Sequence, residues 1–473
     1  MSDGPTVLIM AAGEGTRMRS SLPKVLHPVC GRAMIAWPVL AARDAGASRT
    51  CVIRSPDRDL SGALPEGVET VIQPQADGTG GAIRAALDVV RESETVVVLS
   101  GDHPLISAAV VTALLDAHAA GGAAATVMTT ELDEPAGYGR IVRDSAGDLE
   151  RIVETKHPEG LAADVLAIRE VNTGTYAFAA QPLIEAIERV APDPDSGEYY
   201  LGEVLPLMRA AGQRVGAHLA GDAHVNLGVN DRAGLAAATA EARRRILDDH
   251  MCAGVTIVDP GSTWIDADVG VAADVTIEPG TALRGHTTVG AGSVIGPQTT
   301  ILDSILGDGV AVPHSYLMAC RVADGCQVGP FAYLRPDASL AAGAKAGSFV
   351  EIKNSLVGEG AKVPHLSYVG DADVGAGANV GAGTITANYD GARKHRTKIG
   401  RDARLGVDTA LVAPVEIGDG AYTGASSVIT EDVPAGALAV TRAEQRNVQG
   451  YAERKAAEAD EGRQSSEEDG GER

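Results

Sequence analysis

Aromatic residues and cysteines are scarce in this sequence. Phe, Tyr and Trp make up 3% of its 473 residues, whereas Gly occurs 57 times. This composition excludes a large aromatic core and suits a narrow core of small aliphatic side chains. The five cysteines (Cys30, Cys51, Cys252, Cys320 and Cys326) form no CxxC pair and are odd in number. We therefore expect no disulfide framework, and a reducing cytoplasm as the location.

Positive charge and long apolar runs are also scarce. The chain has 40 Lys and Arg against 63 Asp and Glu, a formal net charge of −23. Nucleic acids and anionic membranes attract basic surfaces, so neither is expected as a partner. There is no charged-then-apolar leader and no run of about 18 or more apolar residues, so we expect neither a signal peptide nor a membrane span.

Apolar residues are regularly spaced in the C-terminal half, where they recur at every sixth position. The clearest members are Val322, Val328, Leu334, Leu340, Ala346 and Ile352, followed later by Ile399, Leu405, Leu411, Ile417 and Thr423. A fixed six-residue period indicates a hexapeptide β-solenoid. With some shifts of phase, the pattern extends from about Val255 to about Val433.

One segment inside this half lacks the period. Residues 388–397 (Asn-Tyr-Asp-Gly-Ala-Arg-Lys-His-Arg-Thr) supply none of the expected apolar positions. A solenoid fills its core at every turn, so this segment is predicted to be a loop that projects from it. Loops on rigid scaffolds are frequent carriers of function.

The first half has an α/β pattern. Short apolar runs at residues 7–10, 50–54, 95–99 and 124–129 alternate with helical patterns at 80–92 and 108–120. This alternation predicts a parallel sheet that binds ligands at the carboxyl ends of its strands. Residues 225–229 are predicted to form a late strand, and Asn230 or Asp231 to cap a long helix that ends near Asp249.

These patterns predict four regions. They are an α/β domain at 1–231, a linker helix at 232–252, a solenoid domain at 253–442 and an acidic tail at 443–473. The tail is charged and poor in apolar residues, so it is predicted to be disordered, with a docked final helix as the less favoured alternative.

A glycine-rich loop with basic residues follows the first apolar run. In residues 10–24, Gly13 and Gly15 allow the backbone to approach a phosphate, and Arg17 and Lys24 can neutralise its charge. The glycine spacing fits neither a Walker A loop nor a dinucleotide fingerprint. Gly-x-Gly alone is equally typical of an ordinary strand-to-helix turn.

Asp102 follows the apolar run at 95–99. A carboxylate at that place is positioned to hold Mg²⁺, which binds proteins through one or two oxygens and takes other ligands from substrate phosphates. An isolated Asp in a turn is also typical of a helix cap. We interpret the neighbouring His103 as a loop residue without a role in the chemistry.

A second group of polar residues lies in the hexad region. Glu351 and Lys353 stand where hexads usually carry small residues, and His365 and Tyr368 follow one coil later. A carboxylate beside an imidazole raises its basicity, which would suit His365 as a base that deprotonates an amine attacking a thioester. Residues about eighteen apart stack in such a solenoid, so the separation of fourteen between Glu351 and His365 leaves a shared wall unproven.

Residues 10–24 resemble the signature of sugar-nucleotide pyrophosphorylases. Together with the hexad half, the chain up to about Arg442 is similar to the bacterial family of bifunctional UDP-N-acetylglucosamine pyrophosphorylases and glucosamine-1-phosphate N-acetyltransferases. The resemblance implies a Rossmann-like α/β nucleotidyltransferase domain, a connecting helix and a left-handed parallel β-helix.

In the first domain the resemblance implies that Asp102 and Asn230 hold Mg²⁺, with Arg17 and Lys24 as catalytic cations. The uracil would be bound by Gln73, Gly78 and Thr79. The sugar and ribose would be bound by Gly139, Glu154 and Asn172. The other implied nucleotide contacts are Met10, Ala11, Ala12, Gly13, Ser100 and Gly101. Ser100 stands where some relatives carry an aromatic residue.

The implied reaction is attack by the phosphate of N-acetylglucosamine-1-phosphate on the α-phosphorus of UTP, with pyrophosphate leaving. The nucleophile is already an anion, so charge neutralisation and positioning supply the catalysis.

In the second domain the resemblance implies acetyl transfer from acetyl-CoA to glucosamine-1-phosphate, with His365 and Glu351 as catalytic residues. The sugar phosphate would be bound by Arg335 and Lys353, and the sugar by Tyr368 and Asn379. The implied acetyl-CoA contacts are Ala382, Asn388, Tyr389, Val407, Ala425 and Arg442. Lys394 would reach a neighbouring subunit of a homotrimer. Val407 replaces a common Ser and Ala387 a common Cys.

Three function classes compete on the sequence. They are the bifunctional enzyme, a pyrophosphorylase with a passive solenoid, and a non-catalytic assembly subunit. Arg17, Lys24 and Asp102 argue against the assembly subunit. A passive solenoid has no need of the set Glu351, His365, Tyr368 and Asn388.

Overall fold

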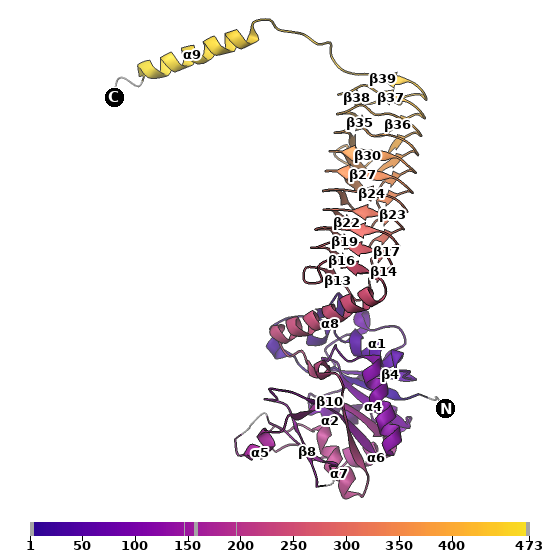
Figure 1. Ribbon diagram of the computed structural model, residues 1–473, viewed down its shortest axis with the longest axis vertical. Helices are drawn as coiled ribbons and strands as arrows, with labels where there is room; N and C mark the ends of the chain where they lie inside the picture. The colour runs from indigo at the N-terminus through magenta and orange to yellow at the C-terminus, as the bar shows by residue number, and fades with distance from the viewer. Residues whose placement is uncertain (1–3, 146, 156–158, 195, 470–473) are drawn as a thin grey trace. The chain divides into compact units, whose positions relative to one another are not determined.

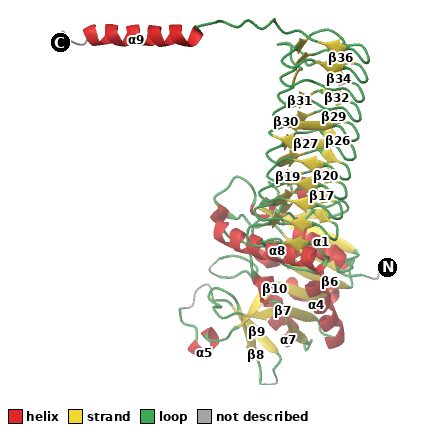
Figure 2. Ribbon diagram, turned by 45° about the horizontal axis from the view of Figure 1, so that its top comes forward, coloured by secondary structure: helices red, strands yellow, loops and turns green. Residues whose placement is uncertain are grey.

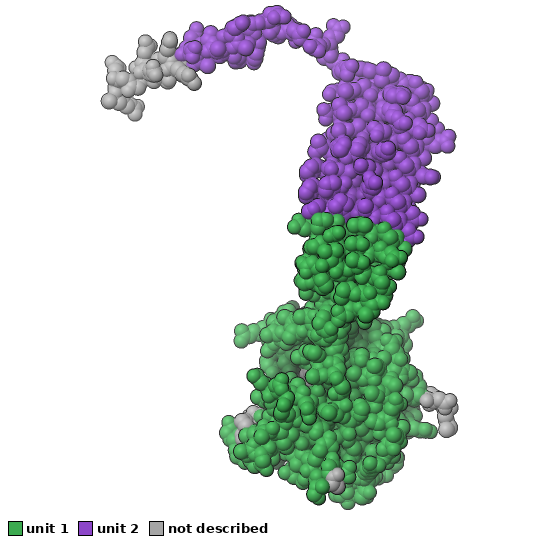
Figure 3. All heavy atoms as spheres, viewed as in Figure 1, with its two compact units in different colours: residues 1–304 green, residues 305–473 purple. Residues whose placement is uncertain are grey.

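The structure of the chain is a computed structural model that describes residues 4–145, 147–155, 159–194 and 196–469. The chain forms two compact units, Met1–Ser304 and Ile305–Arg473 (Figure 3). The first unit contains the α/β domain, a long helix and the first coils of the solenoid. The second contains the remaining coils and the C-terminal segment.

A nine-stranded sheet forms the centre of the α/β domain (Figure 1). Its main path has the order β11-β7-β10-β6-β1-β4-β5; off this path, β8 pairs with β10 and β9 pairs with β8. The strands are β1 (Thr6–Met10), β4 (Arg49–Arg54), β5 (Glu69–Ile72), β6 (Thr95–Ser100), β7 (Ala125–Glu131), β8 (Arg140–Arg143), β9 (Leu149–Val153), β10 (Glu170–Ala179) and β11 (Val215–Leu219). The strands predicted at residues 7–10, 50–54, 95–99 and 124–129 are therefore confirmed.

The sheet is mixed, so the prediction of a parallel sheet is wrong for part of it. β1 is parallel to both β4 and β6, but β10 is antiparallel to β6 and β7. An apolar run indicates a buried strand but carries no information about its direction. The parallel strands that matter for a ligand site, β1 and β6, are direct neighbours.

Helices cover both faces of this sheet. One core cluster packs α2, α3, α6 and α7 on one face, and another packs α1 and α4 on the opposite face. Leu8 of β1 belongs to the first cluster, whereas Val7 and Ile9 belong to the second, as the alternation of a strand requires. The helices are α1 (Ala36–Asp44), α2 (Gly78–Ala85), α3 (Leu87–Arg91), α4 (Ala108–Gly121), α5 (Ala163–Leu166), α6 (Ala180–Ile187) and α7 (Val204–Ala210).

Shorter elements complete the domain. They are the pair β2 (Pro28–Val29) and β3 (Arg32–Ala33) and the 3-10 helices η1 (Thr16–Met18), η2 (Lys24–Leu26), η3 (Ser61–Ala63), η4 (Leu201–Glu203) and η5 (Ala223–Asn226). The strand predicted at 225–229 is absent, because η5 occupies its start. The buried side chains of Val225 and Val229 account for its apolar pattern.

A long helix, α8 (Arg232–Cys252), follows this segment. Its N-cap is Asp231, whose carboxylate accepts a hydrogen bond of 2.8 Å from the backbone N–H of Gly234. The capping residue is therefore Asp231 rather than Asn230, which leaves the Asn230 side chain available for other contacts.

The solenoid consists of short parallel strands stacked in three columns (Figure 2). In the first unit the strands are β12 (Thr256–Ile257), β13 (Trp264–Ile265), β14 (Gly270–Val271), β15 (Thr276–Ile277), β16 (Ala282–Arg284), β17 (Thr288–Val289), β18 (Val294–Ile295) and β19 (Thr300–Leu302). In the second unit they are β20 (Ile305–Leu306), β21 (Ala311–Val312), β22 (Tyr316–Met318), β23 (Arg321–Val322), β24 (Gln327–Val328), β25 (Tyr333–Leu334), β26 (Ser339–Leu340), β27 (Lys345–Ser348), β28 (Glu351–Lys353), β29 (Leu356–Val357), β30 (Lys362–His365), β31 (Tyr368–Gly370), β32 (Ala372–Val374), β33 (Ile385–Ala387), β34 (Thr397–Ile399), β35 (Ala410–Val412), β36 (Val415–Ile417), β37 (Tyr422–Thr423), β38 (Val428–Ile429) and β39 (Leu438–Ala439). The fold is a left-handed parallel β-helix.

The six-residue period corresponds to the core of this β-helix. Every residue of the two predicted series, from Val322 to Ile352 and from Ile399 to Thr423, is at most 5% exposed. The residue before each core position points outward. Small aliphatic side chains fill the narrow interior, so the predicted core is confirmed.

The predicted loop is also confirmed. Ile385 of β33 pairs with Ala410, 25 positions later, whereas Ala410 pairs with Val428, 18 positions later. The extra residues lie between β33 and β34, where residues 388–396 leave the coil.

The C-terminal tail differs from the prediction of disorder. Residues Tyr451–Asp469 form helix α9, because Ala, Glu, Lys, Arg and Gln are strong helix formers. The side chains of residues 451–461 are all exposed, so this part of the helix is not packed against a core. The end of the predicted tail, residues 470–473, lies outside the described residues. No helix in the described part of the chain has the length and apolar character needed to span a membrane.

Replacement of a core leucine is expected to destabilise the β-helix. Leu317 is completely buried, so Leu317→Ala should lower the free energy of unfolding by about 2–5 kcal/mol, from lost burial and from the cavity left behind. Urea unfolding followed by far-UV circular dichroism measures this. The matched control is Leu356→Ala, since Leu356 is 45% exposed. Equal effects of the two substitutions would contradict the assignment of the core.

Candidate functional sites

A cavity of about 690 Å³ opens at the carboxyl ends of β1 and β6. These strands pair in parallel, with Met10 opposite Ser100, so the loops that follow them lie side by side. Predicted site residues that line the cavity are Met10, Ala11, Ala12, Gly13, Lys24, Gln73, Gly78, Thr79, Ser100, Asp102, Glu154 and Asn172. Residues far apart in the chain therefore share one chamber.

The glycine-rich loop is shaped by close contacts. Gly15 has φ of 66°, and a Cβ there would lie 2.6 Å from the Cβ of Lys24, so the loop can pass Lys24 only with glycine at this position. By contrast, a Cβ on Gly13 would have no neighbour within 4 Å, so its backbone borders open space. Arg58, which the sequence analysis missed, donates hydrogen bonds to the carbonyl oxygens of Gly13 (2.7 Å) and Glu14 (2.8 Å). These two bonds hold the loop in place.

An ion pair lies at the wall of the cavity. The Lys24 Nζ is 2.5 Å from Asp102 Oδ2, and the Ser100 hydroxyl donates to Asp102 Oδ1 at 2.6 Å. Burial by itself raises the pKa of the Asp102 carboxyl, but His103, the Lys24 ammonium and these hydrogen bonds lower the pKa to about 2. Burial also lowers the pKa of His103, so its imidazole is neutral near pH 7 and Lys24 carries the effect there. Asp102 is therefore a carboxylate at neutral pH.

Asn230 lies beside Asp102. The backbone N–H of Val229 donates to the Asp102 carbonyl oxygen at 2.9 Å, which brings the two segments together. The Asn230 amide oxygen accepts a hydrogen bond of 3.0 Å from Arg17 Nη2. Neither Arg17 nor Asn230 is among the described residues that line the cavity itself.

These oxygens fit a small divalent cation. Mg²⁺ prefers oxygen ligands and is commonly held by one or two of them, with the remaining positions filled by water and substrate phosphates. The carboxylate of Asp102 and the amide oxygen of Asn230 match that requirement. Within the described parts of the chain, no cluster of three or more His, Cys, Asp or Glu residues could hold a metal entirely by itself.

The opposite wall joins two segments. Gly78 has φ of 92°, and a Cβ there would come within 2.6 Å of the Tyr199 carbonyl oxygen. The Thr79 hydroxyl accepts from the backbone N–H of Leu201 at 2.9 Å. Gln73 is 4% exposed and donates to Asp77 Oδ1 at 2.7 Å. The segment that begins at Glu198 was not predicted, although two adjacent tyrosines in so aromatic-poor a chain are a usable signal.

Asn172, Gly139 and Glu154 lie close together at the far end. The backbone N–H of Asn172 donates to the Gly139 carbonyl oxygen at 2.9 Å, and its side chain donates to the Tyr176 hydroxyl at 2.8 Å. A Cβ on Gly139 would lie 3.2 Å from Glu154 Oε1. Gly139 therefore lies behind the lining residues. Gly101 also lies behind the lining residues, since its N–H donates to the Met10 carbonyl oxygen at 2.9 Å.

Tyr176, Glu198, Tyr200, Gly202 and Glu203 also line the cavity, and the sequence analysis did not predict them. Four of them belong to a stretch without a strong helical or strand pattern. Their approach to the cavity depends on the backbone contacts of residues 199–201 with 79–80, which are visible only in the folded chain.

A second group of predicted residues lies on successive coils of the second unit. Glu351 of β28 stands opposite Tyr368 of β31, and Ser348 of β27 stands opposite His365 of β30. The Glu351 carboxylate pairs with Arg335 Nη1 at 2.7 Å. No ion pair between Glu351 and His365 is found among the described residues. The register between coils is 17 residues here, so a separation of fourteen puts these two in different columns.

His365 ends β30 and is exposed. Its carbonyl oxygen accepts hydrogen bonds from the Ser367 hydroxyl at 2.7 Å and the Gly383 N–H at 3.3 Å. These bonds fix the backbone while the imidazole faces solvent. In the part of the chain that the structure describes, no hydrogen bond to the His365 ring is present.

The projecting loop begins with one buried and one exposed residue. Asn388 is 8% exposed and lies against Tyr368 and Asp371, whereas Tyr389 is 62% exposed. Lys394 lies beside Lys353 of its own chain, and a hydrogen bond and the charge of Lys353 lower the pKa of the Lys394 ammonium. The loop therefore returns towards β28, where Lys353 is placed.

Four further predicted residues form a row along one corner of the coils. The N–H of Asp408 donates to the Ala382 carbonyl oxygen at 2.7 Å. The N–H of Ser426 donates to the Val407 carbonyl oxygen at 2.8 Å. Arg442 Nη1 reaches the Ala425 carbonyl oxygen at 3.3 Å. Asn379 lies in the neighbouring column, paired with Lys362 and Arg404.

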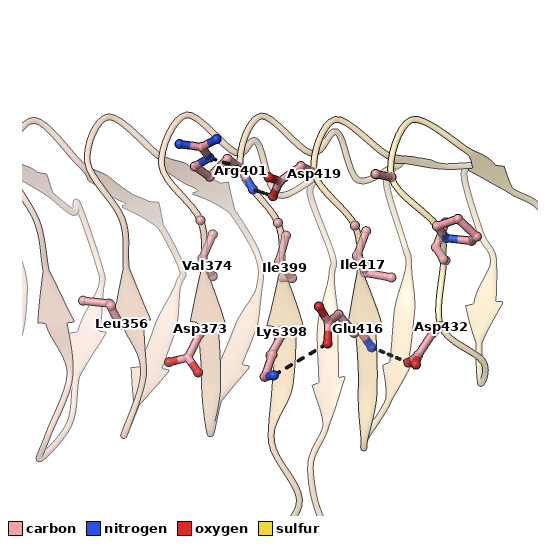
Figure 4. A pocket seen from close by; sticks show the side chains of 16 residues that line it. Leu356, Asp373, Val374, Lys398, Ile399, Arg401, Glu416, Ile417, Asp419 and Asp432 are labelled. Carbon is pink, nitrogen blue, oxygen red and sulfur yellow. Dashed lines mark hydrogen bonds and ion pairs between the residues drawn. The ribbon is translucent and has the colours of Figure 1, made fainter.

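A separate groove, also of about 690 Å³, follows the column that contains β34 and β36 (Figure 4). Its charged side chains satisfy one another, as in Lys398–Glu416 at 3.6 Å and Arg401–Asp419 at 3.6 Å. Among the described residues that line it, none belongs to the predicted sites. Its size alone therefore does not indicate a ligand site.

Comparison with known proteins adds an independent finding. Residues 7–198 match the family described as the MobA-like NTP transferase domain. A bifunctional protein GlmU of Kineococcus radiotolerans is 50% identical over 452 residues, which cover 94% of this chain and 91% of that protein. Bifunctional GlmU proteins of Streptomyces avermitilis and Mycobacterium tuberculosis are each 44% identical, over 95% of this chain and 94% and 92% of their own lengths.

Proposed function

The chain belongs to the family of bifunctional GlmU proteins, and from this premise we propose how its two groups of residues divide the chemistry. It is a uridylyltransferase and an acetyltransferase of UDP-N-acetylglucosamine synthesis, which supplies cell-wall precursors. The observation that supports a two-site proposal is the segregation of the residues. The cavity draws on residues 10–203, and the solenoid group on residues 335–442.

For uridylyl transfer, we propose that the cavity binds UTP and N-acetylglucosamine-1-phosphate. A phosphate oxygen of the sugar phosphate forms a bond to the α-phosphorus of UTP, and the bond to the departing pyrophosphate breaks. No proton needs to move, because the nucleophile is already ionised. Gly13 leaves room for a phosphate, while Lys24 and Arg17 supply positive charge beside it.

Asp102 and Asn230 are proposed to hold Mg²⁺ in this site. When bound, the cation would neutralise phosphate charge and restrict the phosphates to one geometry. The remaining work falls to the chain itself. Gln73, Gly78 and Thr79 orient the base, and Glu154 and Asn172 orient the sugar, so that the two reactants meet in line.

For acetyl transfer, we propose that acetyl-CoA and glucosamine-1-phosphate meet beside His365. The sugar amine attacks the thioester carbonyl, the imidazole takes the proton of the amine, and the CoA thiolate leaves. Arg335 and Lys353 supply charge for the sugar phosphate, and Tyr368 and Asn379 supply hydrogen bonds for the sugar. The row Ala382, Val407, Ala425 and Arg442, with Asn388 and Tyr389, would hold acetyl-CoA.

We also propose a homotrimer, to which Lys394 contributes at a neighbouring site. Support comes from an apolar ridge formed by His314, Phe331, Phe349 and Leu366 at one corner of successive coils. Phe331 and Phe349 are 54% and 59% exposed, and their rings stack at 5.3 Å. Both have φ near 60°, a conformation that bulky residues rarely adopt. The ridge ends at Leu366, directly after His365, so a partner seated on it would border that site.

A cytoplasmic location is proposed as well. All five cysteines are described and none of them forms a disulfide, which is consistent with a reducing compartment.

Loss of the Asp102 carboxylate is expected to affect one activity only. Asp102→Asn keeps the shape but removes the charge, so pyrophosphate release from UTP should fall at least about 100-fold while acetyl transfer stays within about twofold. Coupled assays of both steps, at varied Mg²⁺, measure this. The control is Asp116→Asn on the exposed face of α4. Unchanged pyrophosphate release in Asp102→Asn would refute the assignment.

Loss of the His365 imidazole is expected to have the opposite pattern. His365→Ala should reduce acetyl transfer about 100-fold or more, because general-base catalysis is lost, while uridylyl transfer from supplied N-acetylglucosamine-1-phosphate survives. His286→Ala, an exposed histidine elsewhere on the β-helix, is the control. If His365→Ala abolished both activities, the two-site proposal would fail. Omission of each substrate in turn from the full mixture tests the overall reaction.

Disruption of the ridge is expected to separate the subunits. Phe349→Asp places a charge on the apolar ridge, so light scattering should give a monomeric mass in place of a trimer, with acetyl transfer lost and uridylyl transfer retained. Leu356→Asp, on another column, serves as the control. A monomeric parent protein with full acetyltransferase activity would disprove the trimer.

A further inference from the structure

Asp371 stands at the base of the projecting loop. Among the aspartates at the described coil corners, it is distinguished by the two asparagine side chains that its carboxylate binds. We propose that Asp371 is a positioning residue of the acetyltransferase: it closes the loop 388–397 and orients Asn388 towards the substrates. The inference rests on the proposed acetyl transfer and deepens it.

The carboxyl and carbonyl groups of Asp371 hold both ends of the loop. Its Oδ2 accepts a hydrogen bond from Asn388 Nδ2 at the start of the loop, and its carbonyl oxygen accepts one of 3.1 Å from the Thr397 N–H at the end. Between them, the N–H of His395 donates to the Asn388 carbonyl oxygen at 2.8 Å. One residue of the preceding coil therefore fixes the two points where the insertion leaves and rejoins the solenoid.

The contact also determines which way the Asn388 amide faces. An ionised carboxylate only accepts hydrogen bonds, so the NH₂ group of Asn388 must point at Asp371. The other carboxylate oxygen, Oδ1, is occupied by Asn354 Nδ2 at 2.6 Å. The amide oxygen of Asn388 is then directed away from Asp371, where it is the group left to bind a ligand.

Asp371 also balances two ammonium groups. Burial raises the pKa of its carboxyl, but the hydrogen bonds from Asn354 and Asn388 and the charges of Lys353 and Lys394 outweigh burial, so the pKa lies below its usual value. The carboxylate therefore stays ionised at neutral pH. It offsets part of the repulsion between the Lys353 and Lys394 ammonium groups, which favours the return of the loop towards β28.

A simple turn role does not account for these contacts. Asp303, Asp337 and Asp371 all occupy the same kind of corner with φ between 47° and 64°, where Asp is tolerated. Asp303 and Asp337 are exposed, and the Asp303 carboxylate accepts a hydrogen bond of 2.9 Å from the backbone N–H of His286. Asp371 is 7% exposed and holds side chains from two other coils.

The test compares Asp371→Asn with Asp337→Asn in the full-length protein. Asn at 371 cannot accept from both Asn354 and Asn388, because one of its two groups is a donor. We expect KM for glucosamine-1-phosphate and acetyl-CoA to rise so that kcat/KM falls about tenfold to 100-fold, with kcat much less affected. Uridylyl transfer and the subunit mass should stay as in the parent protein, and Asp337→Asn should match the parent in every assay.

Limited trypsin digestion gives a readout independent of activity. Cleavage after Arg393, Lys394 or Arg396, identified by mass spectrometry, should be several-fold faster in Asp371→Asn than in the parent or in Asp337→Asn. Equal cleavage and kcat/KM within twofold of the parent would overturn the proposal, and so would a parallel loss of uridylyl transfer, which would show damage to the fold. A parent protein without acetyl transfer would instead refute the proposed function, while the digestion still reports on the loop.

Discussion

The backbone ladder between successive coils is the constraint on which the solenoid and its site depend. Each strand has only two to four residues, so a coil is held mainly by hydrogen bonds to its neighbours, such as Glu351 N–H to the Ser367 carbonyl at 2.9 Å. Because the ladder fixes the register, a side chain meets the one at the equivalent position of the next coil. Glu351 therefore lies opposite Tyr368, and Ser348 opposite His365. The composition of the site follows from this stacking more than from proximity in sequence.

An insertion into such a ladder needs compensation at its base. Residues 388–396 contribute nothing to the core, yet pairing resumes immediately afterwards, with Ile399 opposite Ile417. The contacts of Asp371 with Asn388 and Thr397 keep the two ends of the insertion at the spacing of an ordinary turn. The loop can then carry polar and charged residues without disturbing the packing of the coils. A rigid base and an exposed tip suit a segment that must meet a ligand.

The sequence was sufficient where a regular pattern governs structure. The six-residue period identified the β-helix, its core and its interrupted turn, and the apolar runs before Ala11 and Gly101 placed Lys24 and Asp102 on adjacent loops. The sequence was insufficient where the structure depends on the direction of a strand or on the register between coils. An apolar pattern has no direction, so it could not show that β10 runs antiparallel to β6. The register between coils is 17 residues here, so Glu351 and His365, fourteen residues apart, lie in different columns, and Glu351 pairs with Arg335 instead. Tyr200 and Arg58 reach the first site through backbone contacts that no local pattern encodes.

Both candidate sites contain cations that interact with carboxylates. The chain carries a net charge of −23, yet several cations of the two groups act on a carboxylate: Lys24 is paired with Asp102 and Arg335 with Glu351, and the charges of Lys353 and Lys394 lower the pKa of Asp371. Such pairs contribute little net stability, because desolvation offsets much of the attraction. Their effect is geometric, since a long flexible cation is held in one place before a ligand arrives. The acidic surface disfavours anions, so the proposed phosphate sites depend on the cations that these carboxylates hold. Removal of a carboxylate from such a pair would therefore leave the positive charge intact and still weaken the site, because the charge would no longer be held in position.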